Sequence, residues 1–194
     1  MPFESKKYWI DRYATHGGNS GVGSYRIYAE YKANIINKFF IDYNIETVLE
    51  LGCGDGNQLS YLKPKKYYGY DISDFVISKN KKRFNGSNYF FTTNLDELKS
   101  KKFDVVLSLD VIYHLIEDNN YYEYMKNLFF FSKKYVIIYS TNNNNNWLSE
   151  HCKNRIFMND ISNNFKLINK IDNPLKGENT QSDFYFFKNE KNEI

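Results

Sequence analysis

Three closely spaced glycines in the sequence VLELGCGDGNQLSYL, residues 48–62, place the strongest constraint on how this chain folds. The residues leading into them, 47–52, are β-branched or leucine at most positions, which is typical of a short buried strand. Glycine has no Cβ and adopts positive φ readily, so a glycine-rich turn lets a ligand approach the backbone. In open α/β sheets ligands bind beyond the carboxyl ends of the strands. We therefore expect a ligand site where this strand ends.

The turn favours a ligand without phosphate. Gly52, Gly54 and Gly56 follow the spacing G-x-G-x-G, and position 57 is asparagine, so the dinucleotide pattern G-x-G-x-x-G is not met. The chain also lacks the G-K-[ST] of a phosphate-binding loop. The Asp55 carboxylate would repel a pyrophosphate seated at the start of a following helix.

Two further carboxylates indicate what the ligand is. Asp71 ends the next expected strand, where an acidic residue accepts hydrogen bonds from ribose hydroxyls. Glu50 adds a negative charge that suits a cation. Each feature alone also fits a tight turn or a helix N-cap, with Ser73 a competing cap. Together they favour a cationic nucleoside without phosphate, which describes S-adenosylmethionine.

Strand and helix patterns alternate along the chain. We expect strands at 47–52, 67–73, 88–94, 103–110 and 134–140, and helices at 5–14, 25–40, 57–62, 74–84 and 120–132. In the helix at 25–40, Ile27, Tyr31, Ile35 and Phe39 form the expected buried stripe. Two last strand-like runs, 165–172 and 182–189, are too closely joined for a crossover helix and predict an antiparallel hairpin. The expected fold is a doubly wound α/β, mostly parallel seven-stranded sheet with this hairpin at its C-terminal end.

Composition excludes several classes of protein. The chain has 194 residues and no apolar run long enough to span a membrane. Its two cysteines build no disulfide framework, and neither these nor His16 and His151 suggest a metal site. A net charge of +3 with scattered lysines does not indicate nucleic-acid binding. We expect a cytoplasmic protein, a monomer or a homodimer, with no membrane or nucleic-acid partner.

Three segments resemble the motifs of a known family. VLELGCGDGNQL, YYGYDIS and FDVVLSLDVIYHLIED are similar to motif I, the acidic end of strand 2 and motif IV of class I S-adenosylmethionine-dependent methyltransferases. The resemblance spans residues 45–140, and the terminal hairpin matches the family's last two strands. It implies one domain over residues 1–194, with a helical, glycine-rich lid segment at 1–44 and a Rossmann-like core at 45–194.

The resemblance also implies roles for individual residues. Glu50, Gly52 and Gly54 would face the methionine part of the cofactor, with the backbone of Asp55 and Gly56 alongside. Asp71 would hold the ribose, Ile72 would pack on the adenine, and Asn94 and Leu95 would lie near the adenine amino group. Leu109 and Asp110 would border the transferred methyl. Asn94 stands where many members carry an acidic residue.

Two classes of acceptor are excluded by motifs that the chain lacks. Amino-methyltransferases of nucleic acids carry [DNS]-P-P-[YFW] after strand 4, whereas the corresponding segment here is SLDVIYH. Cytosine C5 methylation needs a cysteine nucleophile after strand 4, and none is present there.

Asp110 and His114 are the candidate catalytic residues. They are four positions apart and would share one face of a helix. His114 could be a general base that Asp110 orients, Asp110 could serve alone, or His114 could merely pack. Tyr113 would form part of the pocket wall.

The segment RYATHGGNSGVGSYR, residues 12–26, is expected to lie over the active site. Its glycines could form a nest of backbone N–H groups, with Arg12, His16 and Arg26 adding positive charge and Tyr13 contacting the substrate. Alternatively, the segment is a lid whose glycines are hinges. We expect methylation of an oxygen on a small, saccharide or nucleotide-activated acceptor, as in polysaccharide biosynthesis. The alternatives are a protein or RNA methyltransferase and a non-catalytic S-adenosylmethionine-binding module.

Overall fold

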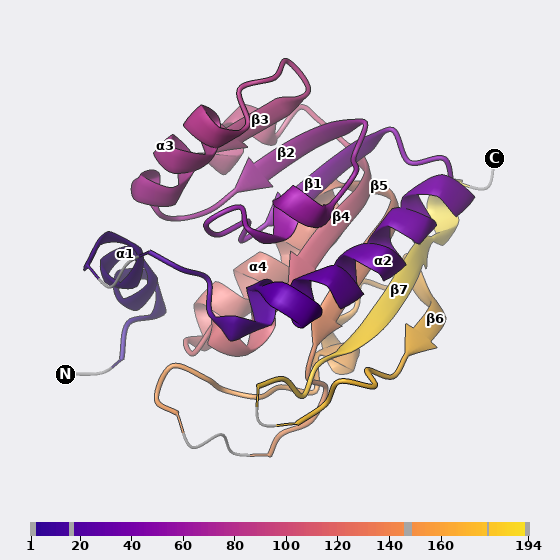
Figure 1. Cartoon of the computed structure of the whole chain (residues 1–194). Coiled ribbons are helices and arrows are strands. Elements are labelled where there is room, and N and C mark those ends of the chain that lie inside the picture. Colours follow the sequence, from indigo (N-terminus) through magenta and orange to yellow (C-terminus); the bar gives the residue numbers. More distant parts are fainter. Residues whose placement is uncertain (1–2, 16–17, 146–148, 178, 193–194) are drawn as a thin grey trace.

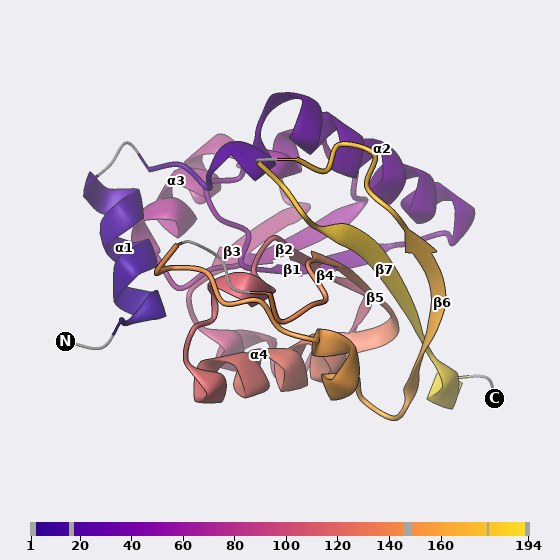
Figure 2. The ribbon, with the colours of Figure 1, turned by 90° about the horizontal axis from the view of Figure 1, so that it is seen from below.

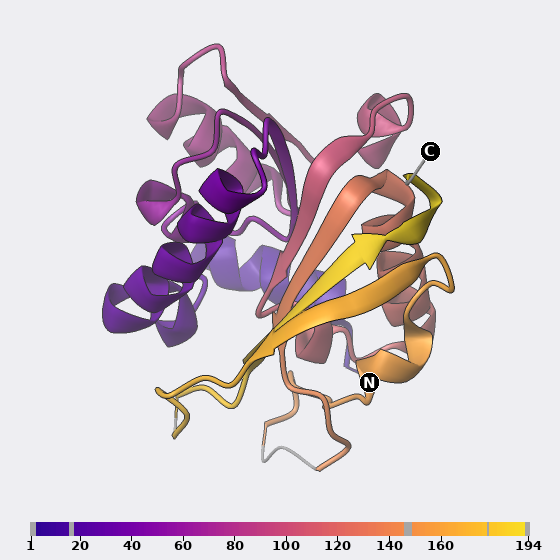
Figure 3. The ribbon, with the colours of Figure 1, turned by 90° about the vertical axis from the view of Figure 1, so that its right-hand side faces the viewer.

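The computed structural model describes residues 3–15, 18–145, 149–177 and 179–192, and its centre is a seven-stranded sheet (Figure 1). The strands are β1 (Thr47–Leu51), β2 (Lys66–Tyr70), β3 (Tyr89–Thr92), β4 (Phe103–Leu109), β5 (Ser132–Ser140), β6 (Phe165–Ile171) and β7 (Asp183–Asn189). Their order in the sheet is β3-β2-β1-β4-β5-β7-β6. Strands β1 to β5 pair in parallel, whereas β7 runs antiparallel to both β5 and β6 at one edge (Figure 3). The predicted sheet and its antiparallel hairpin are confirmed.

Helices cover both faces of the sheet (Figure 2). On one face α2 (Arg26–Asp42) and α3 (Asp74–Arg83) pack on alternate strand residues such as Val48 and Val105. On the other, α4 (Asp118–Phe131) packs on their neighbours Leu49 and Val106. Because both faces are covered, β4 is buried along its whole length, as its continuous apolar run predicts.

Two helix predictions needed correction. The helix expected at 57–62 is a single 3-10 turn, Gln58–Tyr61, because Pro64 disfavours helical backbone at the residue before it. Of the predicted stripe in α2, Phe39 is buried and Tyr31 and Ile35 are partly buried against the core. The other buried residues of the helix are Ala29, Lys32, Ala33, Ile36 and Phe40. Ile27 of that stripe is 55% exposed, since a strict repeat of four drifts off one face of a helix with 3.6 residues per turn.

Helix α1 (Ser5–Thr15) is confirmed and lies near the carboxyl ends of the parallel strands, in contact with α3 (Figures 1 and 2). It is fixed to the segment before α4, because the backbone N–H of Ser5 donates to Glu117 (2.8 Å) and the Ser5 hydroxyl accepts from Ile116 N–H (3.0 Å). The loop that follows contains Gly18 and Gly21, both with positive φ. We call Ser5–Thr15 and residues 18–25 together the N-terminal cover.

No helix in the described parts of the chain combines the length and apolar character needed to cross a membrane.

Candidate functional site

The glycine turn after β1 is the floor of the site. Gly52 and Gly54 have φ of +82° and +53°, which side chains other than glycine rarely adopt. A Cβ on Gly52 would lie 2.6 Å from Val111, and one on Gly54 would lie 2.9 Å from the Tyr13 hydroxyl. Gly56 also has positive φ, but it faces α3 and does not line the cavity. The turn is therefore closed on one side by the cover and on another by the end of β4.

Beyond the turn lies a partly open cavity at the carboxyl ends of the parallel strands. It is lined by most of the residues that the sequence assigned to the cofactor and the reaction: Glu50, Gly52, Asp55, Asp71, Ile72, Leu109, Asp110, His114 and, from the cover, Tyr13. The structure thus brings these predicted residues together at the carboxyl ends of β1, β2 and β4.

Glu50 and Asp71 are the two buried carboxylates on the floor, 3% and 6% exposed. The Tyr67 hydroxyl donates to Glu50 (2.6 Å), and Gly54 N–H and Ser73 N–H each donate to Asp71 (both 3.0 Å). Burial raises the pKa of Glu50 to about 7 and that of Asp71 to about 6. Among the described residues neither carboxylate makes a salt bridge, so both would gain from a cationic or hydroxyl-bearing ligand.

Asn94 and Leu95 do not line the cavity. Asn94 is exposed, and its side-chain oxygen accepts a hydrogen bond from Asp96 N–H (3.0 Å), which caps the short turn Leu95–Leu98. Leu95 packs against the core on the α4 side of the sheet. Both residues make local structural contacts, and their place beside the adenine stays a prediction.

Asp55 holds the N-terminal cover in place. Its carboxylate accepts from Ser20 N–H (2.9 Å) and from the Tyr25 hydroxyl (2.6 Å), and Asp55 N–H in turn donates to the Ser20 hydroxyl (3.0 Å). Gly21 N–H donates to Asn19 (3.0 Å). These backbone donors are thus satisfied within the chain, so the predicted nest for a substrate anion holds a carboxylate of the protein itself.

The predicted cationic groups of the cover do not line the cavity. The Arg12 guanidinium bonds to Asn19 (3.2 and 3.3 Å) and lies over the Trp9 ring. Arg26 is exposed at the start of α2, and His16 lies outside the described residues. From the cover, Trp9, Tyr13, Ser20 and Ser24 face the cavity instead.

Asp110 is held by three donors. Lys32 of α2 contacts one carboxylate oxygen (2.7 Å), and the hydroxyls of Tyr113 (2.9 Å) and Ser182 (3.1 Å) donate to the other. Lys32 is 1% exposed. Asp110 has a φ of +59°, a strained conformation for a residue other than glycine. Backbone and donors together fix its carboxylate in one orientation.

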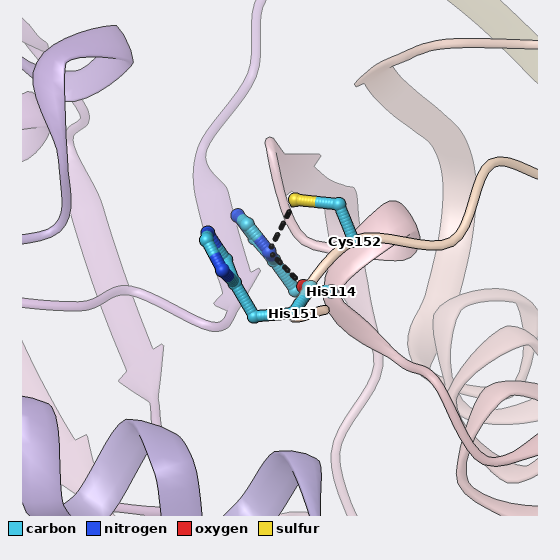
Figure 4. Close-up of side chains that lie close together, drawn as sticks. All are labelled: His114, His151 and Cys152. Carbon is cyan, nitrogen blue, oxygen red and sulfur yellow. Dashed lines mark hydrogen bonds between the residues drawn. The ribbon is translucent and has the colours of Figure 1, made fainter. Parts of the chain in front are cut away.

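His114 belongs to a different cluster from Asp110. The segment between them is a 3-10 turn, Ile112–His114, and Asp110 lies outside it, so the two do not share a helix face as predicted. Nδ1 of His114 lies 2.9 Å from the carbonyl oxygen of His151 and 3.6 Å from Sγ of Cys152 (Figure 4). Burial lowers the pKa of His114 to about 4, so its imidazole is neutral at pH 7.

Several residues of the site were missed in the sequence. Trp9 lies within the expected helix 5–14, but nothing in that pattern indicates the cavity. Tyr124 reaches it from α4, where its hydroxyl donates to the Leu51 carbonyl (2.9 Å). Lys32 carried a signal, since it is a lysine among apolar positions on the buried face of α2.

Comparisons with known proteins agree with this geometry. Residues 49–129 match the model of a methyltransferase domain. Among solved structures, N-methyltransferase NodS from Bradyrhizobium japonicum WM9 with S-adenosyl-l-homocysteine is similar at 12% identity and TM-score 0.74, covering 96% of this chain and 99% of that one. Magnesium protoporphyrin IX methyltransferase from Synechocystis PCC 6803 with bound SAM follows at 15% identity and TM-score 0.69, covering 96% and 98%.

A small RNA methyltransferase, HEN1, is also similar, at 17% identity and TM-score 0.64, with 84% of this chain matching 25% of that protein. A search among curated proteins found no match. At these identities the solved structures establish the fold, and the domain match covers less than half of the chain.

Proposed function

We propose that this chain, which has the class I methyltransferase fold, transfers the methyl group of S-adenosylmethionine to an oxygen of a small acceptor. The observation that carries the proposal is the pair of buried carboxylates, Glu50 and Asp71, at the ends of adjacent parallel strands. A sulfonium cation would offset the burial of their charge. One Asp71 oxygen accepts a hydrogen bond from Gly54 N–H and the other accepts one from Ser73 N–H. Each oxygen can accept a further hydrogen bond, as binding of a ribose hydroxyl requires.

The N-terminal cover favours a small acceptor. Trp9 and Tyr13 lie over the cavity, and Asp55 holds residues 20–25 against the glycine turn. This arrangement suits a compact molecule such as a saccharide unit or an activated precursor of a polysaccharide. The cover gives no support for a phosphate on that acceptor, since Asp55 and Asn19 take up its backbone donors.

Methyl transfer is an in-line displacement that needs alignment of the acceptor and exclusion of water more than it needs a strong base. We assign Asp110, with its three donors, the role of a fixed wall beside the methyl. His114 lines the cavity and is neutral, so it can accept a proton from a hydroxyl, although a pKa of about 4 makes it a weak base.

Calorimetric titration with S-adenosylmethionine tests the cofactor. We expect one site per chain and a loss of affinity of about 10- to 100-fold in Asp71→Asn, because charge-assisted bonds to the ribose are lost. Asp74→Asn, which changes an exposed carboxylate three positions away, is the control. An absence of binding heat in the wild type would refute the proposal.

Transfer of a radiolabelled methyl group tests the acceptor. Saccharides, nucleotide sugars and a short RNA are compared as acceptors, and we expect turnover with a saccharide type. Turnover with RNA alone would replace this acceptor class by RNA, the class that the small RNA methyltransferase HEN1 takes its name from. Binding without turnover on any acceptor would favour a non-catalytic binding module.

A further inference from the structure

His114, His151 and Cys152 form a cluster of metal-ligating side chains at the edge of the cavity (Figure 4). One ligand atom from each lies within 4.8 Å of the other two, and no other such group of three occurs among the described residues. His114 follows β4, whereas the other two are neighbours in the connection between β5 and β6. A bound ion would therefore tie that connection to the reaction site.

We propose that these three side chains bind a divalent ion of the zinc class. Two imidazoles and one thiolate are a common zinc ligand set, and three protein ligands leave a fourth position open. Bond lengths of about 2.0–2.3 Å place tetrahedral ligand atoms about 3.3–3.8 Å apart. The observed ligand atoms lie up to about 1.5 Å farther apart than this, and rotation of the partly buried His151 and Cys152 side chains closes that difference.

The contacts around the rings are those that orient metal-ligating histidines. When the His114 imidazole is neutral, Nδ1–H donates to the His151 carbonyl oxygen (2.9 Å) and Nε2 keeps its lone pair. The Ser149 hydroxyl lies 2.5 Å from Nδ1 of His151 and orients the second ring in the same way.

Helix α1 packs over this cluster. The Tyr8 ring stacks on His151 at 5.0 Å between centroids, and the Trp9 ring meets His114 edge-on at 4.7 Å. These contacts shield the cluster from water. The charged side chains that act on the histidines are Arg12, which disfavours a cation, and Asp110, which favours one at His114.

An ion here changes what His114 does in the reaction. While the imidazole is a ligand, it does not act as the base for a hydroxyl acceptor. Because His114 lines the cavity, the open position of the ion lies close to the acceptor, and a metal-bound hydroxyl loses its proton more readily than a free one.

Titration of the full chain with Co²⁺ alone, without cofactor, tests the site. We expect one Co²⁺ per chain, visible bands of tetrahedral cobalt and a near-ultraviolet thiolate-to-cobalt band, all displaced by Zn²⁺. Cys152→Ser should remove the near-ultraviolet band and weaken binding at least about tenfold. Cys53→Ser changes the other cysteine, which is buried within the glycine turn, and should keep the band.

Circular dichroism checks that each variant is folded. The site is refuted by a wild type without the near-ultraviolet band, by a band that survives in folded Cys152→Ser, or by unchanged affinity in His114→Gln. Since this readout needs neither cofactor nor acceptor, its failure leaves the proposed methyl transfer standing. Failure of S-adenosylmethionine binding likewise leaves the metal site standing.

Discussion

The two sides of the cavity use carboxylates in opposite ways. Glu50 and Asp71 on the floor take their hydrogen-bond donors from nearby sequence, at most 17 residues away. Asp55 is bonded to the cover, 30 and 35 residues away, and Asp110 to α2 and the residue before β7, 78 and 72 residues away. The floor carboxylates are therefore held by local hydrogen bonds, and their negative charge is available to a ligand. The walls are assembled by tertiary contacts, and their carboxylates hold the protein together.

The first prediction breaks the wall. Lys32→Met removes the cation in contact with Asp110 and leaves this largely buried carboxylate with two hydroxyl donors but no charged partner, which should lower the free energy of unfolding by about 2–4 kcal/mol. Urea denaturation measures the change. The matched control is Lys38→Met on the same helix, whose ion pair with Asp42 is exposed and should contribute less than about 1 kcal/mol. Equal stability of the two variants would mean that the Lys32–Asp110 pair does not hold the wall.

The second prediction acts where floor and cover meet. In Gly54→Val the new side chain would collide with the Ser20 hydroxyl and with Tyr13, at a φ that valine does not tolerate. We expect a folded protein whose affinity for S-adenosylmethionine falls at least about 100-fold, equivalent to about 2.7 kcal/mol. Calorimetry measures the affinity.

Gly177→Val is the control for that substitution, because a Cβ there meets nothing within 4 Å. If Gly54→Val bound the cofactor as the wild type does, the turn would not be the floor of the site.

The third prediction concerns the pH dependence that the floor carboxylate Glu50 gives to stability. The pKa of Glu50 is raised to about 7 in the folded chain, so the folded state holds this proton more tightly than the unfolded state. Its contribution to stability is therefore present below about pH 4.5 and is lost as the pH rises through about 7. As the pH rises from about 4.5 to about 7, the free energy of unfolding of the ligand-free wild type should fall relative to that of Glu50→Gln.

Cofactor affinity should change in the opposite direction. In the wild type it should rise with pH as Glu50 ionises, and at pH 8 the variant should bind about tenfold more weakly. Glu30→Gln, on the exposed side of α2, is the control for both measurements. Parallel stability curves for wild type and Glu50→Gln between pH 5 and 8 would contradict the pKa on which this prediction depends.

What could be predicted from the sequence follows the same division. The strands, the glycine turn and the positions of Glu50 and Asp71 depend on neighbouring residues, whose patterns are visible in the chain. The partners of Asp55 and Asp110 could not be predicted, because Ser20, Lys32 and Ser182 reach them only when distant elements pack. The prediction of a helix at 57–62 was wrong for a local reason, because the apolar pattern there is followed by Pro64.

The last and smallest effect concerns the cover. Asp55→Asn keeps one side-chain oxygen but loses the negative charge of the carboxylate that accepts hydrogen bonds from Ser20 N–H and the Tyr25 hydroxyl. This should weaken the attachment of the cover by about 0.5–1.5 kcal/mol. We expect faster hydrogen exchange at residues 18–25, unchanged exchange in β1, and cofactor affinity lowered about three- to tenfold. Asp11→Asn, an exposed change on α1, should alter neither the exchange at residues 18–25 nor the cofactor affinity. If exchange in β1 rose as well, Asp55 would belong to the floor, and the two sides of the cavity would not be separable.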